Sequence, residues 1–258
     1  MSLDYFDTHC HLNHADYDAD GGEVRARARE AGVLRLLCIG WDRASSRRAA
    51  EIAREPGIRA AVGIHPESAD EWGEEAAEEM ARLSAAGGVA AYGEIGLDYH
   101  WEGVLRARQQ EVFAAQVAFA RTLSPTLPLI IHNREALEDT LAVLRASGTP
   151  APIVMHCFTG DTTAARACLD AGHYLGIGGV ATFKKSDDLR AAIAHAPLNR
   201  LLLETDCPYL APQFKRGRRN EPSFLPAVAE AVAAAKGLSV GEVAAATTAN
   251  ALTLFGPG

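Results

Sequence analysis

The chain has 258 residues, 48% of them hydrophobic and 22% charged, and a net charge of −8, which is the composition of an ordinary globular protein. This charge excludes a broad basic surface, so any polyanionic ligand must be bound locally, by metal ions or by a basic loop. The five cysteines form no Cys-x-x-Cys pair and are odd in number, which argues against a disulfide framework. The sequence shows no recognisable signal peptide and no apolar run of about 18 residues, which argues against a membrane span. Together these features predict a cytoplasmic protein.

Apolar runs of strand length recur eight times along the chain. They are residues 4–8, 33–40, 58–64, 89–95, 127–132, 153–158, 174–178 and 200–205. Segments with helical composition and Gly or Pro stops separate them, at 23–31, 44–55, 74–86, 106–123, 134–146, 161–171 and 186–195, and two more follow at 224–236 and 240–254.

This alternation predicts the fold class. Several runs are continuously apolar, which is typical of parallel strands covered on both faces. Eight strand–helix units in a chain of this length predict an α/β protein with one domain, residues 1–258, folded as a (β/α)8 TIM barrel. A doubly wound sheet is the alternative, but the Gly-rich dinucleotide-binding turn is missing after the first strand.

Histidines gather where these strands are expected to end, and in a barrel the chemistry lies at the carboxyl ends of the strands. Five of the nine histidines fall there together with two carboxylates: His9, His11, His65, Glu94, His132, His156 and Asp206. Any one of these histidines alone is best explained as a hydrogen-bonded core residue. So many titratable groups at one end of a barrel need partners, and metal ions would partner all of them at once.

The ligand set fits two divalent ions. We assign one ion to His9, His11, Glu94 and Asp206, and a second to Glu94, His132 and His156, with Glu94 as the bridge. Mixed nitrogen and oxygen ligands suit Zn²⁺ or Mn²⁺, and the ions would attract an anionic substrate to an acidic chain. Three cysteines adjoin the ligands, and strand alternation directs them toward the helices as small buried residues: Cys10, Cys157 and Cys207.

Basic residues follow several of the expected strands. Arg134 comes two residues after His132, Lys184 and Lys185 follow the seventh run, and a basic cluster occupies 215–219. Such a cluster is usually a solvated loop, but beside a metal site it is also a candidate for phosphate contacts. Four aromatic residues nearby could stack on bases or serve only in packing: Trp101, Phe183, Tyr209 and Phe214.

Motifs along the chain resemble those of the TatD-type metal-dependent deoxyribonucleases of the amidohydrolase superfamily. The matching segments are 7–12 (DTHCHL), 63–66 (GIHP), 93–99 (GEIGLDY), 132–136 (HNREA), 156–160 (HCFTG), 204–210 (ETDCPYL), 219–222 (RNEP) and the ending 250–256. They occur in order over nearly the whole chain. The resemblance implies a (β/α)8 metal-dependent hydrolase that acts on DNA, typically as a 3′ exonuclease, although some relatives deacylate D-aminoacyl-tRNA.

The resemblance also implies roles for individual residues. Its metal ligands are those assigned above, with Mg²⁺ or Mn²⁺ for activity and Zn²⁺ as a further option. The residues with implied catalytic roles are Asp206, Glu94 and His65, the last as a phosphate-binding or acid–base group. With the basic loop included, the residues grouped at the substrate are Arg134, Glu204, Lys215, Arg218 and Arg219, with Glu204 expected behind the metal ligands. Glu67 departs from the family pattern, because many relatives carry a second histidine there.

Three functions remain open on these residues. The first is hydrolysis of DNA phosphodiester bonds, on single strands and by a monomer, in which a metal-activated water attacks phosphorus and Asp206 orients it or accepts its proton. The second is a C–N or ester hydrolase of the same superfamily, including a D-aminoacyl-tRNA deacylase. Many such enzymes carry a carboxylated lysine where this chain has Glu94, which favours the nuclease. The third, a barrel that binds metal or a partner without catalysis, predicts missing ligands, and none is missing.

Overall fold

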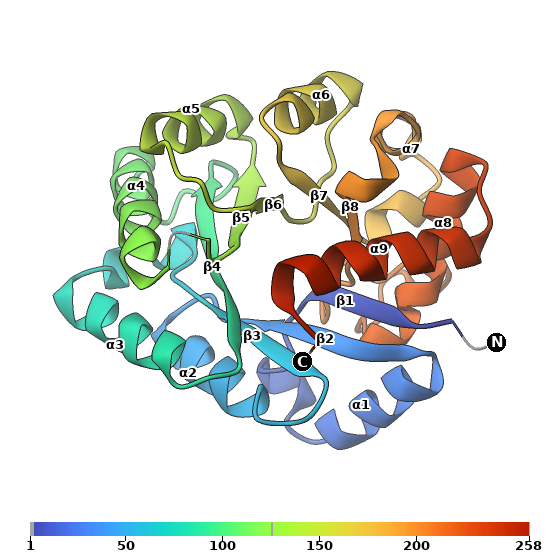
Figure 1. Ribbon diagram of the computed structural model, residues 1–258, viewed down its shortest axis with the longest axis horizontal. Helices are drawn as coiled ribbons and strands as arrows, with labels where there is room; N and C mark the ends of the chain where they lie inside the picture. Colours follow the sequence, from blue (N-terminus) through green and yellow to red (C-terminus); the bar gives the residue numbers. More distant parts are fainter. Residues whose placement is uncertain (1–2, 125, 258) are drawn as a thin grey trace.

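Eight parallel strands pair side by side in chain order and curl into a barrel in the computed structural model, which describes residues 3–124 and 126–257 (Figure 1). The strands are β1 (Tyr5–Cys10), β2 (Val33–Ile39), β3 (Ile58–Val62), β4 (Val89–Asp98), β5 (Leu129–Arg134), β6 (Ile153–Met155), β7 (Tyr174–Ile177) and β8 (Leu201–Leu203). A bridge between Cys10 and Cys207 brings β1 beside β8. The predicted (β/α)8 TIM barrel is therefore confirmed.

Helices follow the strands and form an outer ring, because each crossover between parallel strands must pass over the sheet. They are α1 (Gly21–Glu30), α2 (Arg43–Ile52), α3 (Glu74–Ala85), α4 (Arg106–Leu123), α5 (Leu137–Ser147), α6 (Thr162–Asp170), α7 (Asp187–His195), α8 (Leu225–Lys236) and α9 (Val240–Phe255). In Figure 1, α9 runs across one end of the barrel.

No single helix in the part of the chain that the structure describes is both long and apolar enough to cross a membrane. Pro222–Lys236 and Val240–Phe255 reach that length and hydropathy only when they are counted together across a bend of 109°.

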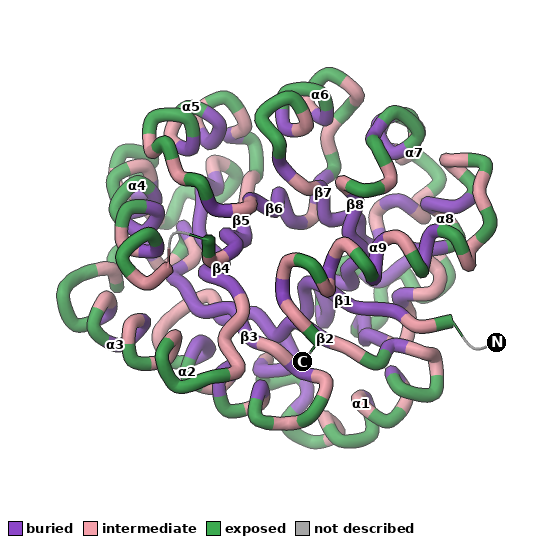
Figure 2. Tube along the Cα trace, in the orientation of Figure 1, coloured by how far each residue is buried: buried purple, intermediate pink, exposed green. Residues whose placement is uncertain are grey.

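Two apolar layers hold the barrel together. The inner layer fills the barrel with residues from its strands, such as Phe6, Ile39 and Ile130, and Phe255 of α9 closes it. The outer, larger layer lies between the strands and the helices. Figure 2 shows this arrangement as buried strands inside helices that are buried on one side and exposed on the other. With the inner layer filling the body of the barrel, the histidines and carboxylates of the predicted site lie beyond it, at the carboxyl ends of the strands.

Three strands extend further at their carboxyl ends than the sequence predicted: β1 continues beyond residue 8 to Cys10, and the extensions of β4 and β5 bear on the rim of the site. β4 continues beyond residue 95 to Asp98 and β5 continues beyond residue 132 to Arg134, because Asp98 pairs with Arg134 across the two strands. As a result, α5 begins at Leu137 rather than at residue 134. The longer strands place Asp98 and Arg134 at the rim of the barrel.

A shift of register in β1 decides which of its side chains face the barrel interior. Phe6 belongs to the inner core, so simple alternation would turn Thr8 inward and His9 toward the helices. The pairing of β1 with β2 takes in one extra residue between Asp7 and Cys10. This irregularity reverses the alternation and turns His9 inward, which is a common use of a bulge beside a functional site.

A similar shift in β4, around Gly93, turns Glu94 inward. Ala91 belongs to the inner core, so alternation alone would send Glu94 toward the helices. The backbone at Gly93 has a φ of 147°, and a Cβ there would lie 2.5 Å from the carbonyl oxygen of Ile130. Only glycine fits this position, so the orientation of Glu94 depends on it.

The side chain of Gln116 in α4 holds the backbone that follows β3, directly before His65. Its Oε1 accepts the backbone N–H of Ile64 at 3.0 Å, and its Nε2 donates to the carbonyl of the same residue at 2.8 Å. Because Gln116→Leu leaves both buried backbone groups without a partner, we expect the free energy of unfolding to fall by about 2–4 kcal/mol. Urea unfolding measures the loss. Gln110→Leu, whose amide contacts only side chains, should cost about 1 kcal/mol, and equal losses would contradict the expectation.

Candidate metal centre

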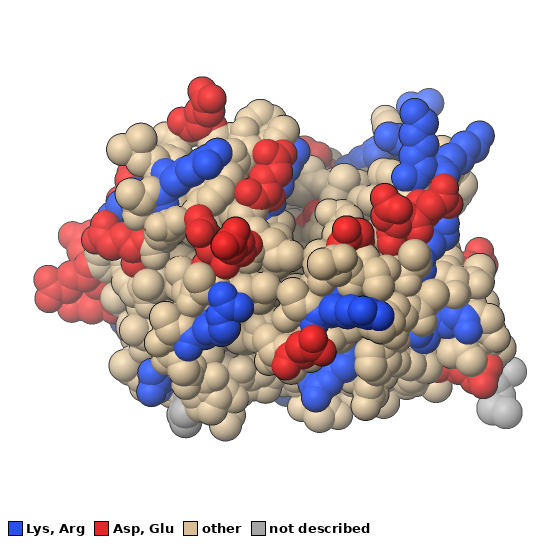
Figure 3. Space-filling model, turned by 90° about the horizontal axis from the view of Figure 1, so that it is seen from above, with Lys and Arg blue, Asp and Glu red and all other residues tan. Residues whose placement is uncertain are grey.

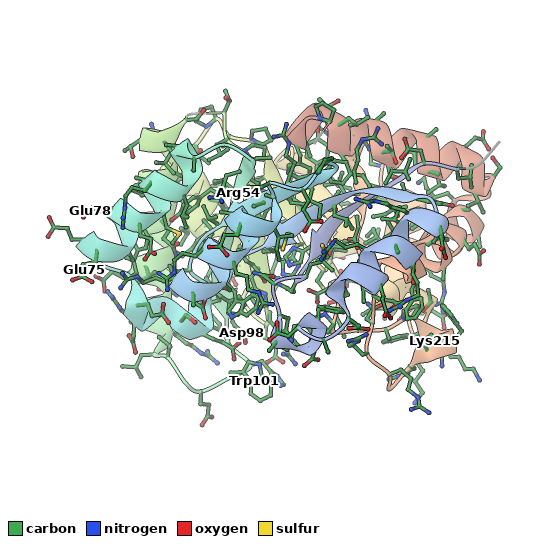
Figure 4. The ribbon with its side chains drawn as sticks, turned by 90° about the horizontal axis from the view of Figure 1, so that it is seen from below. Arg54, Glu75, Glu78, Asp98, Trp101 and Lys215 are labelled. Carbon is green, nitrogen blue, oxygen red and sulfur yellow. The ribbon has the colours of Figure 1, made fainter. Side chains whose placement is uncertain are left out.

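A cavity of about 650 Å³ opens at the carboxyl ends of the strands. Figure 4 shows Asp98 and Trp101, two residues of its wall, at that end of the barrel. The predicted site residues that line the cavity are His11, His65, Glu94, His132, Arg134, His156 and Asp206. His9 is fully buried beneath them. The structure thus brings all six predicted metal ligands and His65 together at one end of the barrel.

Glu94 lies at the centre of this group, and its two carboxylate oxygens face different histidines. Its Oε1 lies 2.8 Å from His132 Nδ1 and 2.6 Å from His156 Nε2. Its Oε2 lies 3.4 Å from His9 Nε2 and 4.0 Å from His11 Nε2. One carboxylate therefore connects two pairs of histidines, which is the placement that a bridging ligand requires.

Asp206 completes the group around His9 and His11. Its Oδ1 lies 3.6 Å from His9 Nε2 and 3.4 Å from His11 Nε2, and these two nitrogens are 3.3 Å apart. Because His11 Nδ1–H donates to the carbonyl of Ile39 at 3.1 Å, the neutral His11 ring presents the lone pair of Nε2 to the group. Lone pairs and carboxylate oxygens that converge in this way repel one another unless a cation lies between them, so the donor set fits a divalent ion.

Asp98 fixes the orientation of His132 on the other side of Glu94. The Nε2–H of His132 donates to Asp98 Oδ2 at 2.9 Å, so the Nδ1 lone pair faces Glu94 and lies 3.2 Å from His156 Nε2. A carboxylate behind a histidine is the usual means of fixing the tautomer of a metal ligand. The sequence reasoning gave Asp98 no role, although its position four residues after Glu94 on the same strand places both on one face.

The pKa values of these side chains show how their charges are balanced when no cation is bound. Burial acts to lower the pKa of His132 and His156, yet both pKa values lie above the ordinary value, because Asp98 and Glu94 raise that of His132 and Glu94 and Glu204 raise that of His156. Burial acts to raise the pKa of Glu94, yet the surrounding histidines hold it well below its usual range. Protons on the histidines therefore balance the carboxylate, and a bound metal ion would displace those protons.

The ligand atoms also cluster at the spacing that metal binding needs. Those of His9, His11 and Asp206 lie within 4.8 Å of one another, as do those of His9, Glu94 and His156. His9 thus joins both groups, and its ring stacks on that of His156 with centroids 3.9 Å apart. The residues present fit a divalent metal centre.

His65 stands beside Glu94 as a neutral hydrogen-bond donor. Its Nδ1 accepts the backbone N–H of Glu67 at 3.2 Å, so the proton of the neutral ring is on Nε2, which lies 3.6 Å from Glu94 Oε1. Burial, reinforced by the neighbouring His132, lowers the pKa of His65 to about 3. The Glu67 carboxylate, which is half exposed, lies 3.7 Å from Nδ1 and adds a negative group to the cavity wall.

Glu204 does not contact the cavity, so its grouping with the substrate-binding residues is corrected. It is fully buried, and its Oε1 accepts the backbone N–H of Cys157 and lies 3.8 Å from His156 Nδ1. Its other oxygen occupies space left by Gly176, where a Cβ would come within 2.1 Å of it. A buried carboxylate in this position supports His156 from behind and cannot reach a substrate.

The predicted orientation of Cys157 was wrong, because this cysteine lines the cavity instead of pointing toward the helices. Its backbone has a φ of 45°, in the left-handed region, which ends the strand alternation of β6 directly after His156. Cys10 behaves as expected: it is fully buried, and its Sγ–H donates to the carbonyl of Leu37 at 3.3 Å.

The basic residues predicted at the substrate divide into two groups. Arg134 lines the cavity, whereas Lys215, Arg218 and Arg219 lie outside its lining, on the loop that follows β8. The guanidinium of Arg219 donates to both carboxylate oxygens of Asp20, at 2.9 Å and 2.6 Å. This ion pair ties the loop to the start of α1, and the substrate contact of Arg219 stays a prediction.

Comparisons with known proteins place these features in one family. The family model described as TatD related DNase matches residues 6–256. The chain is 44% identical over 252 residues to the uncharacterized metal-dependent hydrolase YabD of Bacillus subtilis, covering 97% of this chain and 98% of the relative. It is 38% identical over 259 residues to the 3′-5′ ssDNA/RNA exonuclease TatD of Erwinia amylovora, covering 97% and 99%. The crystal structure of YJJV, a TatD homologue from Escherichia coli, matches with a TM-score of 0.92 and 28% identity, covering 99% of each chain.

Proposed function

The chain belongs to the TatD-related DNase family and is a metal-dependent hydrolase, and from this premise we propose that it is a 3′-5′ exonuclease of single-stranded nucleic acid with two divalent ions at its centre. Relatives named as 3′-5′ ssDNA/RNA exonucleases support the polarity and the substrate class. The observation that carries the proposal is Glu94, whose two oxygens face two separate pairs of histidines.

The two ligand groups would each hold one ion. His9, His11 and Asp206 lie toward Oε2 of Glu94, and His132 and His156 lie at Oε1. When bound, two divalent ions lower the pKa of a water molecule and neutralise charge on the phosphoryl group. We propose Mg²⁺ or Mn²⁺ for activity, and Zn²⁺ is also suited to the nitrogen-rich ligands.

The side chains that face the cavity supply the remaining functions. Asp206 would orient the attacking water and accept its proton, because its carboxylate reaches the cavity beside His11. The neutral N–H of His65 would donate to a non-bridging phosphate oxygen, where it stabilises developing charge. Arg134 would bind a neighbouring phosphate from the rim, with its guanidinium held over the ring of Trp101 at 5.4 Å.

Single-stranded oligonucleotides labelled at one end test the proposal. With Mg²⁺ or Mn²⁺ we expect a ladder of shortening products from the 5′-labelled strand, immediate release of the label from the 3′-labelled strand, and no reaction in EDTA. Internal fragments from both labelled strands would instead indicate an endonuclease and contradict the proposed exonuclease. No cleavage by folded, metal-loaded protein would overturn the nuclease and leave ester hydrolysis, with D-aminoacyl-tRNA as the first substrate to try.

A further inference from the structure

The charges around the cavity mouth are distributed unevenly. Exposed carboxylates follow the strands on one side: Glu67 after β3, Glu102 after β4 and Glu135 after β5. Exposed cations follow β7 and β8 on the other side, and we call these five residues the basic ridge: Lys184, Lys185, Lys215, Arg216 and Arg218. In Figure 3, Lys and Arg side chains project as a group beside the hollow, and Figure 4 shows Lys215 at the same end of the barrel as Asp98.

The two loops that carry the basic ridge form one surface. The backbone N–H of Gln213 donates to Thr182 Oγ1 at 2.7 Å, and the N–H of Lys184 donates to Gln213 Oε1 at 3.4 Å. The guanidinium of Arg216 lies over the ring of Phe183, 4.4 Å from its centroid. The loop after β7 and the loop after β8 therefore present their cations together.

The cations of the basic ridge have no carboxylate partner among the residues that the structure describes. Within residues 3–124 and 126–257, none of the five forms a salt bridge, whereas Arg190 pairs with Asp187 and Arg219 pairs with Asp20 at its borders. In a chain with a net charge of −8, a group of unpaired cations repels itself and attracts an anion. The positive electrostatic potential at the basic ridge would therefore attract a polyanion.

Exposed aromatic rings connect the cavity to the basic ridge. Tyr209 lines the cavity and is 51% exposed, and Phe214, on the same loop, is 62% exposed and rests edge-on against Phe224. A cavity of about 650 Å³ has room for the terminal nucleotides but not for a strand. The remainder of a strand must leave the cavity over its rim, and cations with exposed rings suit single-stranded nucleic acid.

We propose that the basic ridge binds the part of a single-stranded nucleic acid that lies on the 5′ side of the nucleotide being removed, with Phe214 stacking on a base. This inference rests on the proposed function, because it assumes that a 3′ end occupies the metal centre. A nucleic-acid strand is the proposed ligand because a polyanion without bases has no group that could stack on the exposed aromatic rings.

Binding measured in EDTA, where no hydrolysis occurs, tests the proposal. The test variant carries Lys184→Gln, Lys185→Gln and Arg218→Gln, and its matched control carries Arg29→Gln, Arg54→Gln and Arg82→Gln. Both variants remove three exposed cations that form no salt bridge within the described residues, and Figure 4 shows Arg54 away from the end where Lys215 and Trp101 project. The probe is a fluorescent oligothymidylate, followed by anisotropy over a range of salt concentrations.

We expect the test variant to bind the probe at least about tenfold more weakly than the control at low salt, and to reduce the slope of log Kd against log salt by up to about 2, which is about 0.7 per lost phosphate contact. Far-UV circular dichroism should be the same for both variants, because the substituted side chains are exposed. Phe214→Leu should weaken binding of oligothymidylate about tenfold and leave binding of an abasic strand unchanged.

The outcomes separate this inference from the proposed function. If the probe does not bind the wild-type protein, or if the test variant binds it as well as the control does, the basic ridge is not a nucleic-acid surface, whatever the cleavage assays show. If the test variant alone loses binding but the wild type cleaves no strand, the surface stands and the proposed exonuclease fails. Equal losses for abasic and base-bearing strands in Phe214→Leu would overturn the stacking contact.

Discussion

Glu94→Ala is expected to lower kcat/KM for oligonucleotide hydrolysis by at least about a thousandfold, equivalent to about 4 kcal/mol of transition-state stabilisation, and to remove both bound metal ions. The reason is that the two oxygens of Glu94 face both histidine pairs, so its loss would affect both of the proposed ion sites at once. The barrel itself should remain folded, because Glu94 lies above the inner apolar layer and contributes nothing to it. Metal content by mass spectrometry of the native protein and far-UV circular dichroism check the two expectations.

Glu79→Gln is the matched control for this prediction. Glu79 is also a buried carboxylate, but it binds Arg43 at 2.7 Å and Arg47 on the outer face of the barrel, away from the cavity. Its loss should lower stability and leave metal content and kcat/KM within about threefold of the wild type. A Glu94→Ala protein that retains one metal ion per chain and measurable hydrolysis would show that the two sites do not share this carboxylate.

The positions of the candidate metal ligands along the chain were predictable, but the backbone irregularities that orient them were not. The rule that barrel chemistry lies at strand ends was enough to select His9 and Glu94 from the sequence. Yet alternation counted from Phe6 or Ala91 in the inner layer would have pointed both side chains toward the helices. The extra residues in β1 and β4 reverse this, and such irregularities depend on pairing with neighbouring strands that a single sequence does not display.

Glu204 and Asp206 show a second limit of the sequence pattern. Two residues apart at the end of the eighth strand, they would share a face by alternation alone, although the family resemblance already implied that Glu204 lies behind the metal ligands. The structure separates them, because Asp206 has a φ of 56° and turns into the cavity, while Glu204 stays below it beside Gly176. Backbone conformation at the end of a short strand decides which carboxylate reaches the cavity.

The basic residues show why composition alone does not identify a binding surface. Arg218 and Arg219 are adjacent and chemically identical, yet Arg219 is paired with Asp20 and Arg218 has no salt bridge within the described residues. The two partners of that pair lie 199 residues apart in the sequence. Such a contact exists only after the barrel has closed, so only the structure separates a structural cation from an available one.

His65→Ala is expected to lower kcat about a hundredfold while KM and metal content change little, because the residue would act on charge that develops in the transition state. Since burial and the neighbouring His132 lower the pKa of His65 to about 3, the ring is neutral across the working range of pH, and a bound cation nearby would lower that pKa further. His65→Gln, whose side-chain amide still donates a hydrogen bond, should recover part of the loss.

The pH profile separates this role from general acid catalysis. A group whose pKa lies near 3 titrates only at strongly acidic pH, so removing it should lower the plateau of kcat/KM without moving either limb of the profile between about pH 5 and 9. If His65 were instead the general acid, its alkaline limb would vanish in His65→Gln. His100→Ala is the control, because this histidine is exposed and bonds to Glu135 outside the cavity lining, and its loss should change kcat less than about threefold.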